Sequence, residues 1–313
     1  MNKTLCRLTV FLLLSAVFCF AAVERGILLH EAALRITPDP SSEKIAVAPA
    51  GREVAIIEKS HDWIKIFAIV GEVSEEGQAK EVTGWIENKG IVLTSTPNGD
   101  RILFGAAADA EDEASSPRGR RGAAHDAMRL YARTNEYFPN SPLAAEALYR
   151  AGDIRWQIEY TDIRTLPSAK EQDPDVRPKI DEEVMRQVMK KYPHTKWADL
   201  AAYHLLDNKI CGDWQAQAKC PERETELYEK YATEHQQSPK AAEALYNAAR
   251  RQAALIDIYK TEDQSARSST AAARAKDLAK RVATQYPDSD WASRALALEY
   301  KIEQNIPTYG SDK

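Results

Sequence analysis

The residues best suited to acid–base or metal chemistry are the histidines, and they are scattered along the chain. The six are His30, His61, His125, His194, His204 and His235. The sequence has no His-Glu-x-x-His, Cys-x-x-Cys or Gly-x-Ser-x-Gly motif and no glycine-rich phosphate loop. These patterns predict no catalytic residue, no cofactor, no cofactor-binding residue and no metal ligand, and therefore a protein that is not an enzyme.

The cysteine spacing indicates a structural disulfide. Cys6 and Cys19 fall in an N-terminal targeting segment, which leaves Cys211 and Cys220. An even pair in an oxidising compartment is read first as a disulfide, and a metal or redox pair is the alternative. Trp214 lies in the loop between them. It is a candidate partner-binding residue, because exposed loop aromatics are favoured anchors, and its alternative role is to cover a joint between repeats.

Carboxylates are abundant, and two of them occupy equivalent places in a repeated motif. Glu146 and Glu243 each stand beside a small alanine and are candidates for binding basic partners in a groove. The alternative is that both lie on the exposed side of a helix. Further acidic residues open one expected helix, where they complement the helix dipole. They are Glu222, Glu224, Glu226 and Glu229.

The N-terminus has the composition of a targeting segment. Two basic residues accompany an apolar run over residues 8–20, and Ala21 and Ala22 are small enough for cleavage. This pattern predicts a secretory signal peptide over residues 1–22 and a run that is short for a membrane span. A lipid anchor at Cys19 and an uncleaved anchor are the alternatives. We therefore expect an exported, periplasmic protein whose membrane attachment, if any, is N-terminal.

Length, composition and charge limit the number of domains and the kinds of partner that we expect. The chain has 313 residues, which suggests about two domains. Its apolar fraction of 44% is sufficient for globular cores, and its charged fraction of 28% suits a soluble protein. The formal net charge of -5 argues against nucleic acid as a partner, because such proteins need a basic face to displace counterions.

One turn-plus-helix motif recurs in the second half of the chain. Its copies begin at Phe138, Tyr192, His235 and Tyr286. An aromatic residue or histidine ends the first helix, proline breaks the helix in three copies, and Ser or Thr caps the next helix. An alanine then lets the two helices approach closely. Such hairpins bury their apolar faces only against neighbours, which predicts an α-helical solenoid over residues 123–305.

This pattern resembles tetratricopeptide repeats of the exported bacterial kind, found in outer-membrane assembly lipoproteins and periplasmic division-coordinating proteins. The resemblance implies that the helices bind protein partners. The copies are longer than the usual unit of about 34 residues. Extra length lies at residues 165–177 and 265–269, and Gln236 replaces the proline of the third copy.

Residues 23–97 contain short apolar runs separated by turn residues, which predicts a small β-barrel. Its motifs, in order, are Ala33-Leu34-Arg35-Ile36, Gly51-Arg52-Glu53-Val54, Asp62-Trp63-Ile64-Lys65-Ile66 and Gly84-Trp85-Ile86. Their order resembles the bacterial SH3-like family. The resemblance implies that the barrel binds peptidoglycan or another protein, and both stay open.

The remaining segments are expected to lack a core. Residues 98–122 are first small and acidic and then basic, which predicts a flexible linker, and residues 306–313 form a C-terminal tail. The expected protein is multidomain β plus α: an SH3-like barrel, a linker and a tetratricopeptide-like solenoid. We expect an exported adaptor or scaffold of the cell envelope. The alternatives are a self-associating structural component and an accessory subunit of a cell-wall enzyme, and the oligomeric state is open.

Overall fold

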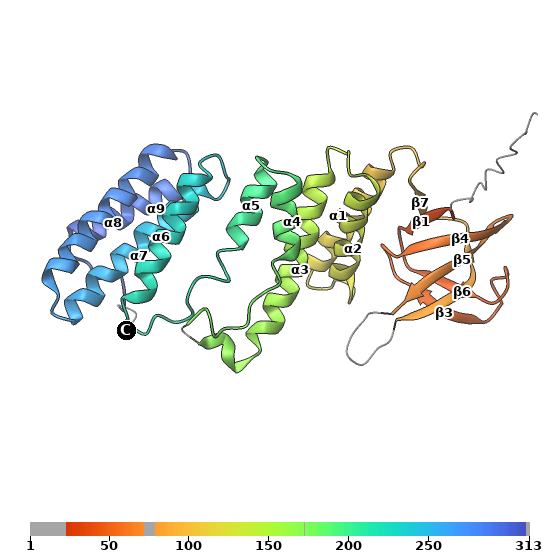
Figure 1. The fold of residues 1–313 in the computed structure, drawn as a ribbon, viewed down its shortest axis with the longest axis horizontal. Helices are drawn as coiled ribbons and strands as arrows, with labels where there is room; N and C mark the ends of the chain where they lie inside the picture. Colours follow the sequence, from red (N-terminus) through yellow and green to blue (C-terminus); the bar gives the residue numbers. More distant parts are fainter. Residues whose placement is uncertain (1–22, 72–78, 172, 311–313) are drawn as a thin grey trace, which may run out of the picture.

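The computed structural model describes residues 23–71, 79–171 and 173–310, and within them the chain forms seven β-strands followed by nine α-helices. The strands gather at one end of the molecule, and the helices extend from them (Figure 1). The predicted signal peptide lies outside the described residues. No helix in the described part of the chain has the length and apolarity needed to cross a bilayer. The predicted order, a β domain followed by helices, is confirmed.

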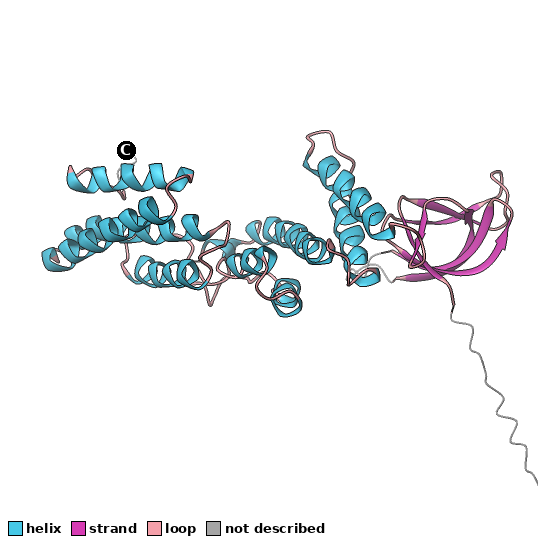
Figure 2. Ribbon diagram, turned by 90° about the horizontal axis from the view of Figure 1, so that it is seen from above, coloured by secondary structure: helices cyan, strands magenta, loops and turns pink. Residues whose placement is uncertain are grey.

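The strands form one antiparallel sheet, which curves in Figure 2, in the order β3-β2-β6-β5-β4-β1-β7. Their bounds are β1 (Arg25–Leu28), β2 (Ala32–Arg35), β3 (Lys44–Ala48), β4 (Glu53–Ser60), β5 (Trp63–Val70), β6 (Lys80–Glu87) and β7 (Ile91–Leu93). Alternate residues of β5, from Ile64 to Val70, are buried in the core of this domain. The period of two is that of a strand with one buried face.

The helices follow in chain order. Their bounds are α1 (Gly99–Ser115), α2 (Ala123–Tyr137), α3 (Ala144–Arg164), α4 (Glu183–Lys191), α5 (Lys196–His204), α6 (Lys219–Glu234), α7 (Ala241–Thr261), α8 (Ser265–Gln285) and α9 (Asp290–Glu303). A short 3₁₀ helix, η1 (Pro167–Lys170), lies in the insert after α3. The four copies of the motif correspond to the turns before α3, α5, α7 and α9.

The repeated motif forms the predicted turns, but its Ser or Thr residue caps the next helix in two of the four copies and not in the others. Thr195 and Ser289 cap α5 and α9, each accepting a hydrogen bond at 3.3 Å from the backbone N–H three residues later. Ser141 and Ser238 instead accept from the residue two positions later, inside the turn. The crossing alanines have no exposed surface, which explains why a larger side chain is absent there. They are Ala147, Ala201, Ala244 and Ala295.

The prediction of a flexible linker over residues 98–122 is wrong, because α1 occupies most of that segment. Leu103 and Ala107 are fully buried, and Glu111 accepts a hydrogen bond at 2.7 Å from the Tyr131 hydroxyl of α2. An alanine-rich acidic segment has the composition of a linker, but alanine is also the best helix former. Leu103 and Phe104 pack against the shared apolar cluster, whereas Ile102 beside them is exposed.

The β domain packs directly against α1 and α2. Ile27, Ala50 and Val92 of the β domain belong to the same apolar cluster as Leu103 and Leu130 of the helices. The β domain is therefore docked on the helices through a shared core, and the segment that connects them in sequence is part of that core.

The two parts approach each other closely at Gly51. Its φ is +74°, and a Cβ placed there would lie 2.5 Å from Cβ of Arg129 and 2.9 Å from the backbone nitrogen of Leu130. The Nε–H of Arg129 donates a hydrogen bond at 3.0 Å to the carbonyl of Ala50. Only glycine satisfies both the backbone conformation and the space available.

The described part of the C-terminal tail, residues 306–310, packs back on the helices. The Thr308 hydroxyl donates to the carbonyl of Ala253 at 2.8 Å, and the Thr308 N–H donates to Asp257 at 2.8 Å. The Tyr309 ring lies 5.6 Å from the Trp214 ring. The end of the described chain therefore covers the loop that follows α5.

Candidate functional site

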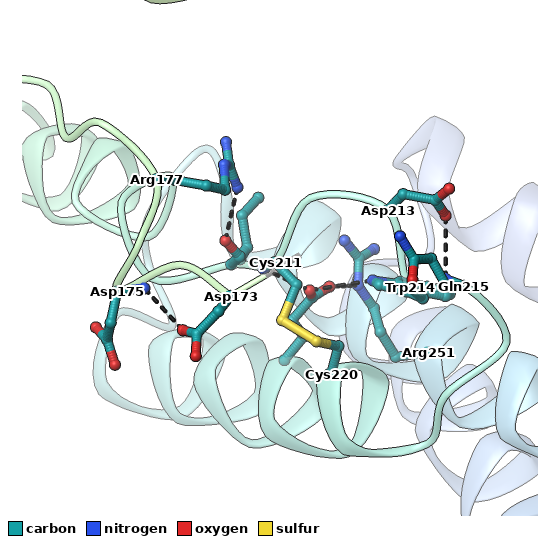
Figure 3. The surroundings of a disulfide bond; sticks show 11 residues. Asp173, Asp175, Arg177, Cys211, Asp213, Trp214, Gln215, Cys220 and Arg251 are labelled. Atoms are coloured by element: carbon teal, nitrogen blue, oxygen red, sulfur yellow. Dashed lines mark hydrogen bonds and ion pairs between the residues drawn. A yellow bond between two sulfur atoms is a disulfide. The ribbon is translucent and has the colours of Figure 1, made fainter. Parts of the chain in front are cut away.

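The predicted disulfide is present between Cys211 and Cys220, with an S–S distance of 2.11 Å and a Cα–Cα distance of 6.0 Å. It joins the loop after α5 to the first turn of α6 (Figure 3). This loop bridges α5 and α6, which lie farther apart in Figure 1 than the paired helices on either side. The bridge therefore fixes the connection between the second and third hairpins.

Reducing this disulfide is expected to lower the free energy of unfolding by about 2.7 kcal/mol, because the crosslink no longer restricts the unfolded chain. The effect is modest because the closed loop is short and the stabilisation grows with loop length. Urea unfolding of the full chain with and without reductant measures the change, and Cys211→Ser/Cys220→Ser is the matched variant. Stability that is equal with and without reductant would contradict this structural role.

Glu224 of α6 holds the same loop in place through hydrogen bonds. It is 1% exposed and accepts hydrogen bonds from the Cys211 backbone N–H at 2.9 Å and from the Trp214 indole at 3.1 Å. Its other oxygen pairs with Arg251 of α7 at 2.9 Å. The sequence predicts Glu224 as one of several residues that complement a helix dipole, so its buried role is a finding of the structure.

Trp214 is half-buried. Its indole N–H donates to Glu224. Its ring centre lies 5.6 Å from that of Tyr309 and 5.5 Å from the guanidinium carbon of Arg251. This arrangement fits the alternative role, in which Trp214 covers the joint between repeats. A partner-binding role for Trp214 stays a prediction.

Glu146 and Glu243 both take part in contacts within the chain. Glu146 pairs with Arg150 at 2.8 Å, and Glu243 pairs with Lys240 at 2.7 Å and accepts from the Tyr203 hydroxyl at 3.1 Å. Both are half-buried. Glu146 therefore pairs within α3, whereas Glu243 links α7 to Tyr203 of α5. Binding of a basic partner by these residues stays a prediction.

His204 is placed in a polar cluster between α3 and α5. Its Nε2 lies 3.0 Å from Asp153 and 3.2 Å from the Tyr149 hydroxyl. Burial raises the pKa of the Tyr149 hydroxyl, which is therefore protonated at neutral pH. Both contacts use the same ring nitrogen, whereas a general-base histidine needs one nitrogen for its orienting carboxylate and the other for the nucleophile.

No metal site accompanies this cluster. Within residues 23–71, 79–171 and 173–310, no group of three or more His, Cys, Asp or Glu residues is placed to hold a metal ion. The contacts of the cluster connect α5 to α3.

The best candidate for a ligand site is a groove of about 290 Å³ where the β domain meets α2. We call it the junction groove. Its lining residues include Arg25, Arg52, Glu53, Phe67, Ile69 and Arg133. The first five belong to the β domain, and Arg133 comes from α2, so the groove exists because the two parts are docked.

Strand pairing explains why these side chains share one face. Arg25 of β1 lies opposite Ala55 of β4, and Ala55 lies opposite Phe67 of β5. Residues two positions away along a strand point to the same side of the sheet, which adds Glu53 and Ile69. Ile69 is 43% exposed. The outcome is an apolar strip on the outer face of the sheet, bordered by arginines.

The electrostatics of the groove are set by three arginines and Glu53, with Glu136 beside Arg133 as a second carboxylate at the edge. Glu53 lies 3.3 Å from Arg25 and 3.6 Å from Arg133, and it accepts from the Tyr137 hydroxyl at 2.9 Å. Burial, aided by Glu53, raises the pKa of Tyr137, which stays protonated at neutral pH. Arg52 donates to the carbonyl of Gly71 at 3.1 Å. The groove therefore combines an apolar floor with an excess of positive charge.

Comparison with known families bears on this domain. Residues 30–92 match the bacterial SH3 domain family. The predicted resemblance of the β domain is confirmed, and the junction groove therefore lies between an SH3 domain and the first helices. No curated protein matches the chain.

Among solved structures, a chain titled "DHF58 filament" is similar at 15% identity over 66% of this chain and 91% of its own length, with a TM-score of 0.24. A TM-score this low carries no argument about fold or function. The tetratricopeptide-like character of the helices stays a prediction.

None of the residues that line the junction groove is among the binding residues predicted from the sequence. Arg25, Phe67 and Arg133 are far apart in sequence, and Arg133 lies in a helix that the sequence places beyond a flexible linker. The feature of the sequence that could have indicated the groove is the position of Phe67 and Ile69. In an alternating strand, both fall on the face opposite to the buried residues. Large apolar residues on the polar face of a small sheet indicate a covered or ligand-binding surface.

Proposed function

We propose that this protein is an exported, non-enzymatic adaptor of the bacterial cell envelope, in which the SH3 domain and the helices bind partners as one docked unit. The observation that carries the proposal is the junction groove, because its walls come from both parts. A ligand held there contacts the SH3 domain and α2 together. The helices offer a further surface for protein partners.

The chemistry of the groove defines the ligand class. Phe67 and Ile69 provide an apolar floor, and Arg25 and Arg133 supply cations at its edge. A short peptide segment with an apolar side chain and a carboxylate fits this combination. Bacterial SH3 domains are modules for cell-wall or protein binding, so the segment belongs to cell-wall peptide or to a protein partner.

Export and lack of catalysis are supported by separate features. A disulfide is typical of proteins in oxidising compartments, and the pair Cys211–Cys220 is bonded. The histidine cluster around His204 lacks the two-sided geometry of an acid–base relay. Hydrolysis of peptidoglycan by the purified protein would contradict the non-enzymatic part of the proposal.

Sedimentation with purified peptidoglycan sacculi, together with photo-crosslinking in the native envelope, tests the groove. The photo-reactive residue replaces Ile69, and Ile36, an exposed apolar residue outside the groove, is the matched position. We expect ligand capture at Ile69 and none at Ile36. Phe67→Ala and Arg133→Gln are each expected to weaken binding by about tenfold, and Arg250→Gln, on an exposed part of α7, leaves it unchanged. Equal capture at both positions would contradict the proposal.

A structural, self-associating role is the second candidate, and α9 provides the observation that favours it. Leu296 and Tyr300 of this last helix are 55% and 61% exposed and lie one helical turn apart. An array of helices ends with such an apolar face unless a further unit covers it. Light scattering on the full chain separates the candidates: a monomer supports the adaptor, and a concentration-dependent oligomer abolished by Leu296→Glu supports self-association.

A further inference from the structure

A second cavity, independent of the junction groove, lies beside the insert that follows α3. It has a volume of about 230 Å³, and we call it the insert pocket. The end of α3, η1, the loop of residues 174–180 and the segment after α5 form its walls. The residues that line it include Ile163, Arg164, Lys170, Arg177, Ile180 and Asp207.

The charge of the insert pocket is strongly positive. Its lining holds Arg164, Lys170, Arg177 and Lys179 but one carboxylate, Asp207, among the described residues. Lys179 lies 3.6 Å from Asp175. Arg164, Lys170 and Arg177 form no ion pair with a described residue. Burial raises the pKa of Asp207. The pocket therefore has unneutralised cations and suits an anion.

Arg177 is the cation that the structure positions most firmly. One terminal N–H of its guanidinium donates at 2.9 Å to the carbonyl of Ile210, as Figure 3 shows from the disulfide side. Its Nε is buried and has no hydrogen-bond partner in the described part of the chain. A buried donor without an acceptor is costly. Because Nε itself has almost no accessible surface, an anion in the pocket would pair with the charge and the remaining N–H groups of the guanidinium.

The rest of the pocket is preformed and partly apolar. Asn208 accepts from the Ile180 N–H at 3.0 Å and donates to the Ile180 carbonyl at 2.8 Å, which fixes the loop of residues 174–180 to the segment after α5. Ile180 is 5% exposed, and Ile163 packs against the same apolar cluster. One side of the pocket therefore offers apolar contact and the other offers guanidinium and ammonium groups.

We propose that the insert pocket binds a small carboxylate with an apolar body, its carboxylate on Arg177 and its body against Ile163 and Ile180. Guanidinium groups bind carboxylates through paired hydrogen bonds, which adds geometric selectivity to charge. Arg164 and Lys170 stand at the rim and add to the positive potential. This site goes beyond the proposed function and does not depend on it.

Calorimetric titration of the full chain with sodium hexanoate tests the site, with hexylammonium and inorganic phosphate as comparison probes. We expect saturable binding of hexanoate, weaker binding of phosphate and none of hexylammonium. Arg177→Gln is expected to weaken hexanoate binding by about tenfold. Arg164→Gln, at an exposed rim position, is expected to weaken it by about threefold.

Arg250→Gln is the matched control, because Arg250 is exposed on α7 and outside the pocket. It should bind hexanoate as the unchanged protein does. Circular dichroism of each variant confirms folding, and Arg164→Gln keeps the test valid if Arg177→Gln unfolds. Absence of saturable hexanoate binding, equal binding of hexylammonium or phosphate, or unchanged affinity in Arg164→Gln and a folded Arg177→Gln would overturn the proposal.

Discussion

Replacing Glu224 with alanine is expected to lower the free energy of unfolding by about 3–5 kcal/mol, because it removes one partner of a buried ion pair. Arg251, whose side chain is 12% exposed, would lose its carboxylate. The same substitution removes the acceptor of the Cys211 N–H and of the Trp214 indole. One change therefore affects α6, α7 and the disulfide loop. Urea unfolding at neutral pH measures the loss.

Glu226 provides the matched control on the same helix. It is exposed and two residues away, so Glu226→Ala should change stability by less than about 0.5 kcal/mol. The pair of variants separates the buried ion pair from any general effect of negative charge near the start of α6. Equal effects of the two substitutions would mean that Glu224 contributes through the helix dipole, as the sequence alone predicts.

Replacing Gly51 with alanine is expected to cost about 2–5 kcal/mol. The positive φ of Gly51 costs an L-residue about 1–2 kcal/mol, and overpacking against α2 adds about 1–3 kcal/mol. The new Cβ would lie 2.5 Å from Cβ of Arg129 and 2.9 Å from the backbone nitrogen of Leu130. Neither atom can move away unless the backbone of α2 moves. The variant should also lose ligand capture at Ile69, because the groove needs the docked helix.

Gly122 separates these two costs. Its φ is +89°, and a Cβ added there would meet no atom within 4 Å. Gly122→Ala should therefore show the backbone cost alone, about 1–2 kcal/mol. If Gly51→Ala cost no more than Gly122→Ala in urea unfolding, the close packing of the SH3 domain against α2 would be contradicted.

Local patterns predicted much of the fold. Alternation in Ile64-Lys65-Ile66 predicted a half-buried strand, and the aromatic-Pro-x-Ser/Thr motif predicted the turns that begin α3, α5 and α9. These features depend on residues close in sequence, whose preferences act within a few positions. The pairing of Cys211 with Cys220 was predictable by elimination, because the other two cysteines fall in the predicted signal peptide.

Features that depend on distant residues were not predictable. The composition of residues 98–122 suits both a solvated linker and a helix, and the choice depends on whether Leu103 has a partner surface. That surface is formed by α2 together with Ile27 and Val92 of the β domain. Similarly, nothing near Glu224 in sequence indicates that Arg251 lies beside it. Tertiary contacts decide such cases and override local preference.

Docking of the SH3 domain on the helices is tested most directly by a distance measurement between spin labels. Glu58→Cys on β4 and Gln157→Cys on α3 place labels on exposed positions of the two parts, with the native disulfide kept intact. Double electron–electron resonance on the full chain is expected to give one narrow distance distribution, because the two parts share a core. A broad distribution, as for domains on a flexible linker, would contradict the docked arrangement and the groove built on it.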